Sequence, residues 1–477
     1  MGSAALGLTL ALLIGAAPLD LALPAIGGLA LVIGMLIAPP IGLYALLVGV
    51  PFSPSLGIAE AGFSLSAVEP LALLLLLIWL ARGVVDRPVE RPSVDSANPA
   101  RTRVLTALFA LLCVLLIASG GATSLPLAIK ESLKWVLLFL AFVLTSAYVR
   151  TEADARGVLA ALFCAGAGQG LVGLVQFVGG FGPPTFAVGG FMRAHGNFGQ
   201  PNPFAGYLGT ILPLALALAA IPHPGRFRTI ARVALVATGL GIILSLSRGA
   251  WLGLLIALAV MALVWSARTR RFVAPTATVL VLVGLLGILG ALPLALATRV
   301  TSVVDNFGIF DARLVPPTSE NFAVVERMAH WQAGWEMFLD HPWLGVGPGN
   351  YPAVYERYAI AGWREPLGHA HNYYLNMAAE TGLVGLTTFL LFLYFAFRAI
   401  LRLVRTGDRP VSLKALQASD RDRTASPTVF NRALAVGLLG TFVVFCTHNL
   451  FDNLLVHGVS IQIGVLLGLV GGVASDG

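Results

Sequence analysis

Residues 368–397 read GHAHNYYLNMAAETGLVGLTTFLLFLYFAF, a short polar turn that runs directly into a long apolar stretch. Similar apolar runs recur along all 477 residues, separated by polar loops. The chain is 57% hydrophobic and only 11% charged, whereas soluble proteins carry roughly 25% charged residues. Together with a mean hydropathy of +0.86, this pattern places most of the chain in a lipid bilayer.

Helices are the expected spanning elements, because the bilayer core has no water to satisfy exposed backbone groups and the runs do not alternate as strands would. Fourteen apolar runs can be delimited, and since the first three are short we expect about 12 to 14 spans. Residues 1–17 lack a basic leader region and are interpreted as a retained first span. The runs lie near residues 5–18, 22–38, 39–51, 64–82, 104–120, 127–148, 157–178, 203–221, 233–246, 250–266, 273–297, 372–397, 433–449 and 456–474.

The predicted fold class is all-α, a polytopic transmembrane helix bundle with one large extracytoplasmic helical loop. Residues 1–297 would form an N-terminal bundle, and residues 298–370 the loop with its short helices. Residues 371–477 would form the C-terminal membrane helices, joined by a basic cytoplasmic loop at 398–432. Within the external loop, apolar residues at helical spacing predict a helix over residues 321–339.

The positively charged residues sort the loops into two faces. Alternate loops hold 21 of the 30 Lys and Arg residues, so by the positive-inside rule these loops and both termini face the cytoplasm. The net charge of +7 then reflects loop orientation and gives no reason to expect a nucleic-acid partner. The basic loops are residues 82–103, 149–156, 222–232, 267–272 and 398–432.

The polar residues suited to chemistry gather on the opposite, extracytoplasmic face. This one-sided distribution favours a reaction at the outer surface of the membrane over a path through it. We expect these residues to share an outward cavity that opens laterally to lipid. They are Arg193, His195, Arg248, Arg327, His369, His371, His448 and Asp452.

Several motifs, in this order along the chain, together resemble the O-antigen ligase and polymerase superfamily of bacterial membrane glycosyltransferases. The resemblance covers roughly residues 60–470. Residues 447–452 (THNLFD) are similar to the last external turn of that family. The other motifs are residues 193–208 (RAHGNFGQPNPFAGYL), residues 245–250 (SLSRGA), Glu326-Arg327 with the helix that carries Trp331 and Trp335, and His371-Asn372.

The resemblance implies an enzyme of cell-envelope polysaccharide or lipopolysaccharide biosynthesis. Such enzymes take a glycan from an undecaprenyl-diphosphate carrier and transfer it to an acceptor hydroxyl, without a metal and with inversion at the anomeric carbon. By the same resemblance, His371 would be the catalytic residue, and Arg193, Arg248 and Arg327 would bind the diphosphate. The implied partners are the lipid-linked donor, the acceptor and membrane lipid.

Arginine suits a diphosphate because its planar guanidinium binds phosphate oxygens in pairs and keeps its charge near lipid. Arg248 lies between two apolar runs, where an ionisable group costs about 2.5–3.5 kcal/mol or more at mid-bilayer and so marks a functional hypothesis. Simpler explanations are also open. Arg248 can extend to the interface from a tight turn, and Arg193 can be an exposed loop residue. Arg327 can pair with Glu326 or Glu320.

His371 is the candidate general base, since an imidazole titrates near neutral pH; a capping or interfacial histidine is the alternative. His369 is assigned a supporting role, with loop packing as its alternative. Asn372, in the same motif, is also assigned a supporting role. His448 and Asp452 lie on another external turn and are the expected orienting partners of His371. Their i, i+4 spacing places them on one face if that turn is helical.

No metal or other cofactor is expected. His369 and His371 are spaced i, i+2, and further ligands are scattered along the chain instead of standing at motif spacing. Cys113, Cys164 and Cys446 lie inside apolar runs, which favours core packing over a disulfide or a zinc site.

Ligase-type transfer is the leading hypothesis, with a glycan, lipid or protein hydroxyl as the acceptor. Polymerase activity, or protein O-oligosaccharide transfer from the same donor, is the nearest alternative. A transporter of a small anion such as bicarbonate would show ionisable groups near the midplane and inverted repeats. Glu69 is the best mid-span charge, and no repeat is visible. The sequence does not identify the sugar, the acceptor, the chain length or the oligomeric state.

Overall fold

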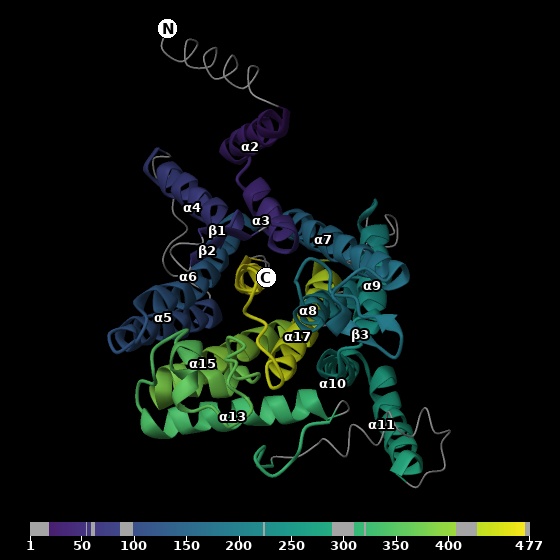
Figure 1. The fold of residues 1–477 in the computed structure, drawn as a ribbon. Coiled ribbons are helices and arrows are strands. Elements are labelled where there is room, and N and C mark those ends of the chain that lie inside the picture. The colour runs from purple at the N-terminus through teal and green to yellow at the C-terminus, as the bar shows by residue number, and fades with distance from the viewer. Residues whose placement is uncertain are drawn as a thin grey trace.

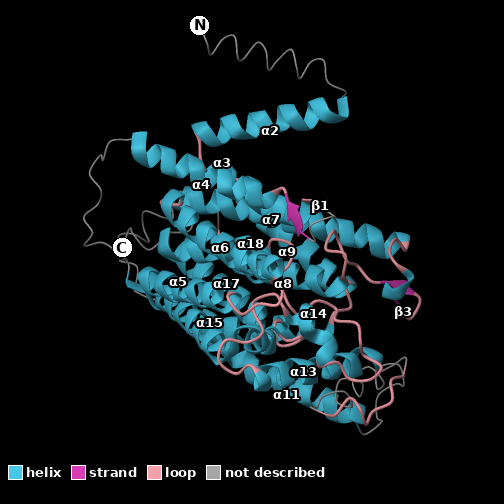
Figure 2. Cartoon of the chain, turned by 60° about the vertical axis from the view of Figure 1, so that its left-hand side comes forward, coloured by secondary structure: helices cyan, strands magenta, loops and turns pink. Residues whose placement is uncertain are grey.

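The computed structural model describes residues 19–53, 55–58, 63–85, 99–222, 225–288, 310–318, 321–406 and 427–472. Within these ranges the chain is almost entirely helical (Figures 1 and 2). The helices are α2 (Leu19–Ile37), α3 (Pro40–Phe52), α4 (Val68–Val85), α5 (Pro99–Ser119), α6 (Leu125–Tyr148), α7 (Glu152–Gly179), α8 (Pro201–Ala219), α9 (Phe227–Leu244), α10 (Arg248–Trp265), α11 (Ala267–Ile288), α13 (Phe322–Asp340), α14 (Tyr351–Val354), α15 (Tyr373–Thr406), α17 (Pro427–His448) and α18 (Val459–Gly472).

The remaining regular elements are short. Two antiparallel hairpins pair β1 (Ser55–Ile58) with β2 (Phe63–Ser66) and β3 (Ala187–Val188) with β4 (Phe191–Met192). Two single-turn 3₁₀ helices, η3 (Pro184–Phe186) and η4 (Tyr355–Arg357), lie in loops. None of these elements is long enough to cross a bilayer, so the spanning part of the described chain is helical.

Seven described helices are long and apolar enough to cross a membrane, which confirms the predicted all-α polytopic class. Three shorter apolar helices, at Ile26–Ile37, Pro40–Phe52 and Val459–Val470, accompany them. The first span predicted from the sequence, residues 5–18, lies outside the described residues. The seven are Pro99–Ser119, Glu152–Gly179, Pro201–Ala219, Phe227–Leu244, Arg248–Trp265, Tyr373–Arg405 and Thr428–His448.

Helix α8 is the centre of the bundle, with 83% of its apolar window buried. Small residues let its neighbours approach closely, as expected where helices pack in a membrane. A Cβ added at Gly209 would lie 2.9 Å from Val444 of α17, and one added at Gly437 of α17 would lie 2.9 Å from Leu214 of α8. Helix α8 therefore fixes the position of the loop that precedes it, residues 193–200.

Helix α13 confirms the amphipathic helix predicted for residues 321–339. It lies alongside the first turns of α15 (Figure 1), where a Cβ added at Gly334 would lie 3.3 Å from Leu375. Its inner face joins α14 and η4 in a small apolar core that includes Met337 and Tyr351. The segment before α15 is thus a packed helical layer over the bundle.

Helix α15 is broken at Gly382, whose φ of +64° and ψ of −165° are not helical. A Cβ at this residue would lie 2.2 Å from the carbonyl carbon of Trp343, so the turn after α13 presses directly on the break. The backbone amide of Leu383 donates to the carbonyl of Pro342 at 2.7 Å. The sequence alone predicted a regular helix from 372 to 397, and the break is a correction made by tertiary packing.

Several loops meet at one end of the bundle. The backbone amide of Tyr373, at the start of α15, donates to the carbonyl of Asn449 after α17 at 2.8 Å. The side chain of Asn350 bonds to both backbone groups of Ser124, just before α6. The polar residues that the sequence assigned to one face are therefore carried by loops that contact one another.

Candidate functional site

The turn before α15 positions two histidines. His371 has a φ of +52°, a left-handed conformation that is uncommon for a residue with a Cβ. Its carbonyl accepts a hydrogen bond from the indole nitrogen of Trp331 at 3.3 Å, and the next residue, Asn372, accepts from the amides of Tyr374 and Leu375. Asn372 therefore caps the helix through its side chain, and the cap and Trp331 hold the turn in shape.

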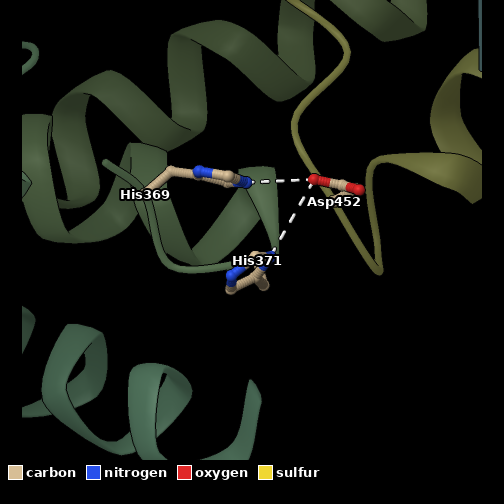
Figure 3. Close-up of side chains that lie close together, drawn as sticks. All are labelled: His369, His371 and Asp452. Carbon is tan, nitrogen blue, oxygen red and sulfur yellow. Dashed lines mark hydrogen bonds and ion pairs between the residues drawn. The ribbon is translucent and has the colours of Figure 1, made fainter. Parts of the chain in front are cut away.

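Asp452 is the partner that the two histidines share. Its Oδ1 accepts a hydrogen bond from Nε2 of His369 at 3.0 Å and lies 3.9 Å from Nδ1 of His371. Figure 3 shows both rings on one turn, converging on the carboxylate from a separate loop. Burial alone would raise the pKa of Asp452, but the hydrogen bond from His369 and the neighbouring histidines hold it well below its ordinary range. Asp452 is therefore an anion beside His371.

His371 is partly buried, and neither of its buried ring nitrogens has a hydrogen-bond partner among the described residues. Burial, together with His369 and Arg327, lowers the pKa of His371 to about 3, although Asp452 acts in the opposite direction. The ring is therefore neutral at physiological pH and can accept a proton. Unpartnered buried polar atoms are uncommon and costly, so this imidazole is available for a ligand or a reaction.

His448 is almost fully buried and is the last residue of α17. The sequence placed it on one face with Asp452 only if the turn between them is helical. In the structure α17 ends at His448, and Asp452 lies in the following turn. His448 still acts electrostatically on Asp452, and Asp452 contacts His369 more closely than it contacts His371. His448 and Asp452 thus join the site from a turn instead of from a shared helix face.

His330 is a residue that the sequence did not single out. It lies on α13, is 1% exposed, and its ring centroid is 5.4 Å from that of His371. Its ring stacks on Tyr355, and its Nδ1 lies 3.0 Å from the hydroxyl of Tyr351, which itself donates to the His330 carbonyl. Because that hydroxyl has one proton, His330 must carry the proton on Nδ1. Burial, together with the charge of His369, lowers its pKa to about 4.

A single face of α13 carries three of these residues. Arg327, His330 and Trp331 are spaced i, i+3 and i+4, which places them on one side of a helix. The charge of Arg327 acts on both His371 and His448. No ion pair joins Arg327 to Glu326 within the described chain, and Glu320 lies outside it.

Arg193 is held by two hydrogen bonds. Its Nε donates to the carbonyl of Ser245 at 2.8 Å, and its terminal nitrogen donates to Oδ1 of Asn202 at 3.2 Å. Burial, together with the charges of Arg327 and Arg248, lowers the pKa of Arg193 to about 10. At this pKa Arg193 is cationic at neutral pH. The charges of Arg248 and Arg327 thus act on Arg193.

Two glutamine side chains of α7 accept hydrogen bonds from the loop that carries Arg193. Oε1 of Gln176 accepts from the amides of His195 and Gly196, and Oε1 of Gln169 accepts from the amide of Asn197. Gly196 has a φ of +54°, and a Cβ there would lie 2.5 Å from Oε1 of Gln169. The glycine is therefore required for this close approach, and the loop is fixed before any ligand arrives.

Three residues of the site have the donor set of a cation site. The ligating atoms of His369, His371 and Asp452 all lie within 4.8 Å of one another. Two imidazoles and a carboxylate are ligands for Zn²⁺ or Fe²⁺. The same three groups also form a hydrogen-bonded acid–base cluster, and the His369–Asp452 hydrogen bond favours that use.

The shared outward cavity predicted from the sequence stays a prediction. A cavity of about 780 Å³ opens at this end of the described chain, but its lining includes neither His371 nor any of the three arginines. It is lined instead by residues of α3, α4, α6 and two loops. The site residues converge beside this cavity.

Comparison with known proteins identifies part of the chain. Residues 233–390 match the family model described as O-antigen ligase. This segment, about a third of the chain, is similar to the O-antigen ligase family. No curated protein matches the chain.

The O-antigen ligase segment extends from α9 into α15 and contains Arg248, Arg327, His369 and His371. Three other residues of the site, Arg193, His448 and Asp452, lie outside it. The hydrogen bonds of Arg193 to Ser245 and of Asp452 to His369 join these flanking residues to the segment. The superfamily segment therefore supplies part of the site, and the rest of the bundle completes it.

Proposed function

We propose that this membrane protein is a glycosyltransferase that moves a glycan from undecaprenyl diphosphate to an acceptor hydroxyl. The observation that supports this proposal is that a candidate base and three cationic side chains act on one another electrostatically. A neutral, unpartnered His371 lies beside the anionic Asp452, and Arg193, Arg248 and Arg327 act electrostatically on one another or on that histidine. A base and a cationic phosphate site are the two requirements of transfer from a lipid diphosphate.

In the proposed reaction the acceptor oxygen attacks the anomeric carbon of the donor sugar. The bond between that carbon and the diphosphate oxygen breaks, and the electron pair leaves with the diphosphate, which the arginines stabilise. His371 takes the hydroxyl proton. Its Nδ1 faces Asp452 at 3.9 Å, so Nε2 is the proposed acceptor of the proton. Attack from the face opposite the leaving group inverts the anomeric carbon, and no metal is required.

Asp452 and His369 would act through His371. As His371 gains a proton, the nearby carboxylate stabilises the positive charge that develops. His369 donates to the same Oδ1 and fixes its orientation. Asn372 and His448 are proposed as supporting residues that shape the turn and the field around Asp452.

The reaction is proposed to take place at the outer face of the cytoplasmic membrane. This placement rests on the positive-inside rule, which assigns the basic loops and both termini to the cytoplasm. The layer at residues 298–370 would then be extracytoplasmic, between an N-terminal bundle at 1–297 and C-terminal helices at 371–477. The acceptor would be a glycan, as in a ligase or polymerase, or a lipid or protein hydroxyl.

The test uses purified protein in nanodiscs, an undecaprenyl-diphosphate oligosaccharide and a panel of glycan, lipid and peptide acceptors. We expect His371→Ala to lower turnover by about 10²- to 10⁴-fold, the range that a general base contributes. His341→Ala is the matched control, because His341 is an exposed histidine at the far end of α13.

Transfer that persists in EDTA would exclude the use of His369, His371 and Asp452 as an essential cation site. Equal turnover by wild type and His371→Ala would remove His371 as the base. A folded wild type that transfers to none of the acceptors would contradict the proposed function and favour transport.

A further inference from the structure

Large apolar side chains are exposed at the C-terminal end of α13. Trp335 and Leu339 are 51% and 52% exposed, and Trp343, in the turn that follows, is 66% exposed. These three residues succeed one another at intervals of four, so Trp335 and Leu339 lie on one strip of the helix. Leu344, beside Trp343, is also exposed. Single apolar side chains on a surface need no explanation, but a contiguous set marks an interaction surface.

We call Trp335, Leu339, Trp343 and Leu344 the apolar edge of α13. Charged side chains border it, because Glu336 and Asp340 are exposed and form the neighbouring strip, about 100° further round the helix. An apolar strip beside a charged strip is typical of a helix at a membrane interface. Both charged residues are acidic, so burial of the apolar edge, and not attraction to anionic headgroups, would drive such contact.

The apolar edge continues into an exposed face of α15. The backbone amides of Leu383 and Val384 donate to the carbonyls of Pro342 and Trp343, at 2.7 and 3.3 Å. Helix α15 is one of the described helices that are long and apolar enough to cross a membrane, so its exposed face contacts lipid. That face repeats at helical spacing and comprises Leu383, Val384, Thr387, Leu390, Leu391 and Tyr394.

The length of α15 places the apolar edge at the boundary of the membrane. Nineteen residues separate Leu383 from Arg402, which is about 28 Å at 1.5 Å per residue. The hydrocarbon core of a bilayer is about 30 Å thick. A span that ends near the basic residues Arg402 and Arg405 therefore begins near Leu383, at the level of Trp343. Tryptophan is enriched at this level of a membrane, among the lipid headgroups.

We propose that the apolar edge of α13 contacts membrane lipid, with its side chains at the boundary between headgroups and acyl chains. Another side of the same helix carries Arg327 and His330, which lie in the His371 site. Lipid contact at the edge fixes how far these two residues stand from the membrane surface. The inference concerns where the helix lies, so it does not depend on the proposed reaction.

The first experiment measures the depth of single positions with spin labels. In a full-length variant without Cys113, Cys164 and Cys446, a cysteine replaces Leu339 or Trp343, is labelled with a nitroxide, and is reconstituted in phosphatidylcholine nanodiscs. Oxygen concentrates in lipid, whereas a nickel chelate stays in water. We expect the ratio of oxygen to chelate collisions at both positions to be several times the ratio at a site in water.

Two reference positions calibrate that ratio. Leu390→Cys reports lipid, because Leu390 belongs to the exposed face of α15. Glu356→Cys reports water, because Glu356 is exposed on η4 in the same layer as α13. Ratios at Leu339→Cys and Trp343→Cys that lie between the two references support the proposal. Ratios equal to that of Glu356→Cys would overturn it.

A second measurement uses the tryptophans and needs no label. Phosphatidylcholine that is brominated near the headgroup end of its acyl chains quenches the fluorescence of tryptophans that it contacts. Changing Trp335→Phe together with Trp343→Phe keeps the edge apolar but removes two of the eight tryptophans, so the quenched share of the emission should fall. Trp363→Phe is the matched control. Trp363 packs against the apolar core under α13, so its removal should not lower that share.

An equal quenched share in wild type and in the double variant would overturn the proposal. The exposed tryptophans could instead stack on a glycan. In that case a water-soluble oligosaccharide would change the emission of wild type and not of the double variant, while brominated lipid would quench both equally. That result would assign the apolar edge to the glycan and exclude lipid as its partner.

Discussion

His371 combines three properties that rarely occur together in one residue. Its backbone is left-handed at a φ of +52°, its two ring nitrogens are buried, and these nitrogens have no hydrogen-bond partner in the described chain. Left-handed backbone in a residue other than glycine costs on the order of 1–3 kcal/mol and persists only where neighbours impose it. Trp331 and Asn372 impose it here. This strain is consistent with a turn shaped for function.

The pKa of His371 gives a prediction about pH. In the free protein that pKa is about 3, so His371 remains a base as pH falls through the ordinary histidine range near 6.5. The acid limb of kcat/KM, which reports groups of the free enzyme, should therefore lie well below pH 6. Arg327→Gln removes a cation that lowers this pKa, so it should move the acid limb to higher pH.

The measurement is kcat/KM from pH 4 to 9 for wild type and Arg327→Gln. A wild-type acid limb near 6.5 would contradict the structure. The free energy of unfolding should also fall as pH falls. Because the unfolded chain binds a proton at His371 below about pH 6.5 and the folded chain does not until about pH 3, the stabilising contribution is complete above 6.5 and is lost as pH falls through that window.

The resemblance of the motifs, together with the residue types, selected His371 and the three arginines as candidates. The hydrogen-bond partner of Asp452 could be predicted only in part from the sequence. The sequence identified it as an orienting group, but its direct hydrogen bond goes to His369. That choice depends on how the turn after α17 docks on the turn before α15, a long-range contact that spacing along the chain cannot encode.

At the scale of elements, α13 shows what a pattern can and cannot predict. The spacing of its apolar residues predicted the helix over 321–339, and the structure confirms it at Phe322–Asp340. The pattern did not show that His330 faces His371, because both faces of this helix are covered in part. Only the packing of α13 on α15, α14 and η4 distinguishes the face that carries His330.

The break in α15 gives a prediction at this scale. Gly382→Ala should destabilise the protein by about 1–3 kcal/mol or more, because an L-residue is strained at a positive φ. The added Cβ would also lie 2.2 Å from the backbone of Trp343. Thermal unfolding in nanodiscs measures the change. Gly239→Ala is the control, since Gly239 is inside α9 and its Cβ would meet Leu212 at an ordinary 3.6 Å.

Alanine at Gly239 should leave stability unchanged or raise it slightly, because alanine favours a helix over glycine by about 1 kcal/mol. Equal melting temperatures for Gly382→Ala and Gly239→Ala would mean that the break does not require glycine. The turn at Pro342 and Trp343 would then not control the break in α15.

At the scale of the molecule, the site is assembled from loops and helices far apart in sequence. Arg193 precedes α8, Arg248 starts α10, Arg327 lies on α13 and Asp452 follows α17. The alternation of apolar runs and basic loops was enough to predict that these groups share one face. The neighbouring cavity was not predictable, because its residues come from α3, α4, α6 and two loops with no common motif.

The orientation of the bundle is the last prediction. Arg364 is exposed in the segment before α15, and Arg270 is exposed on α11 in a basic cluster. In a variant without Cys113, Cys164 and Cys446, a single cysteine replaces either arginine, and intact cells are treated with a membrane-impermeant maleimide. By the positive-inside rule, Arg364→Cys should be labelled in intact cells, and Arg270→Cys only after permeabilisation.

The opposite labelling pattern would place the His371 site in the cytoplasm. Transfer at the outer leaflet would then be impossible, whatever the chemistry of the histidine and the arginines. Labelling of both cysteines in intact cells would indicate a continuous aqueous path between the two ends, as a transporter needs. One-sided labelling at Arg364 restricts the arginines and His371 to a single surface, where a lipid-linked diphosphate can approach from the membrane while its glycan remains in water.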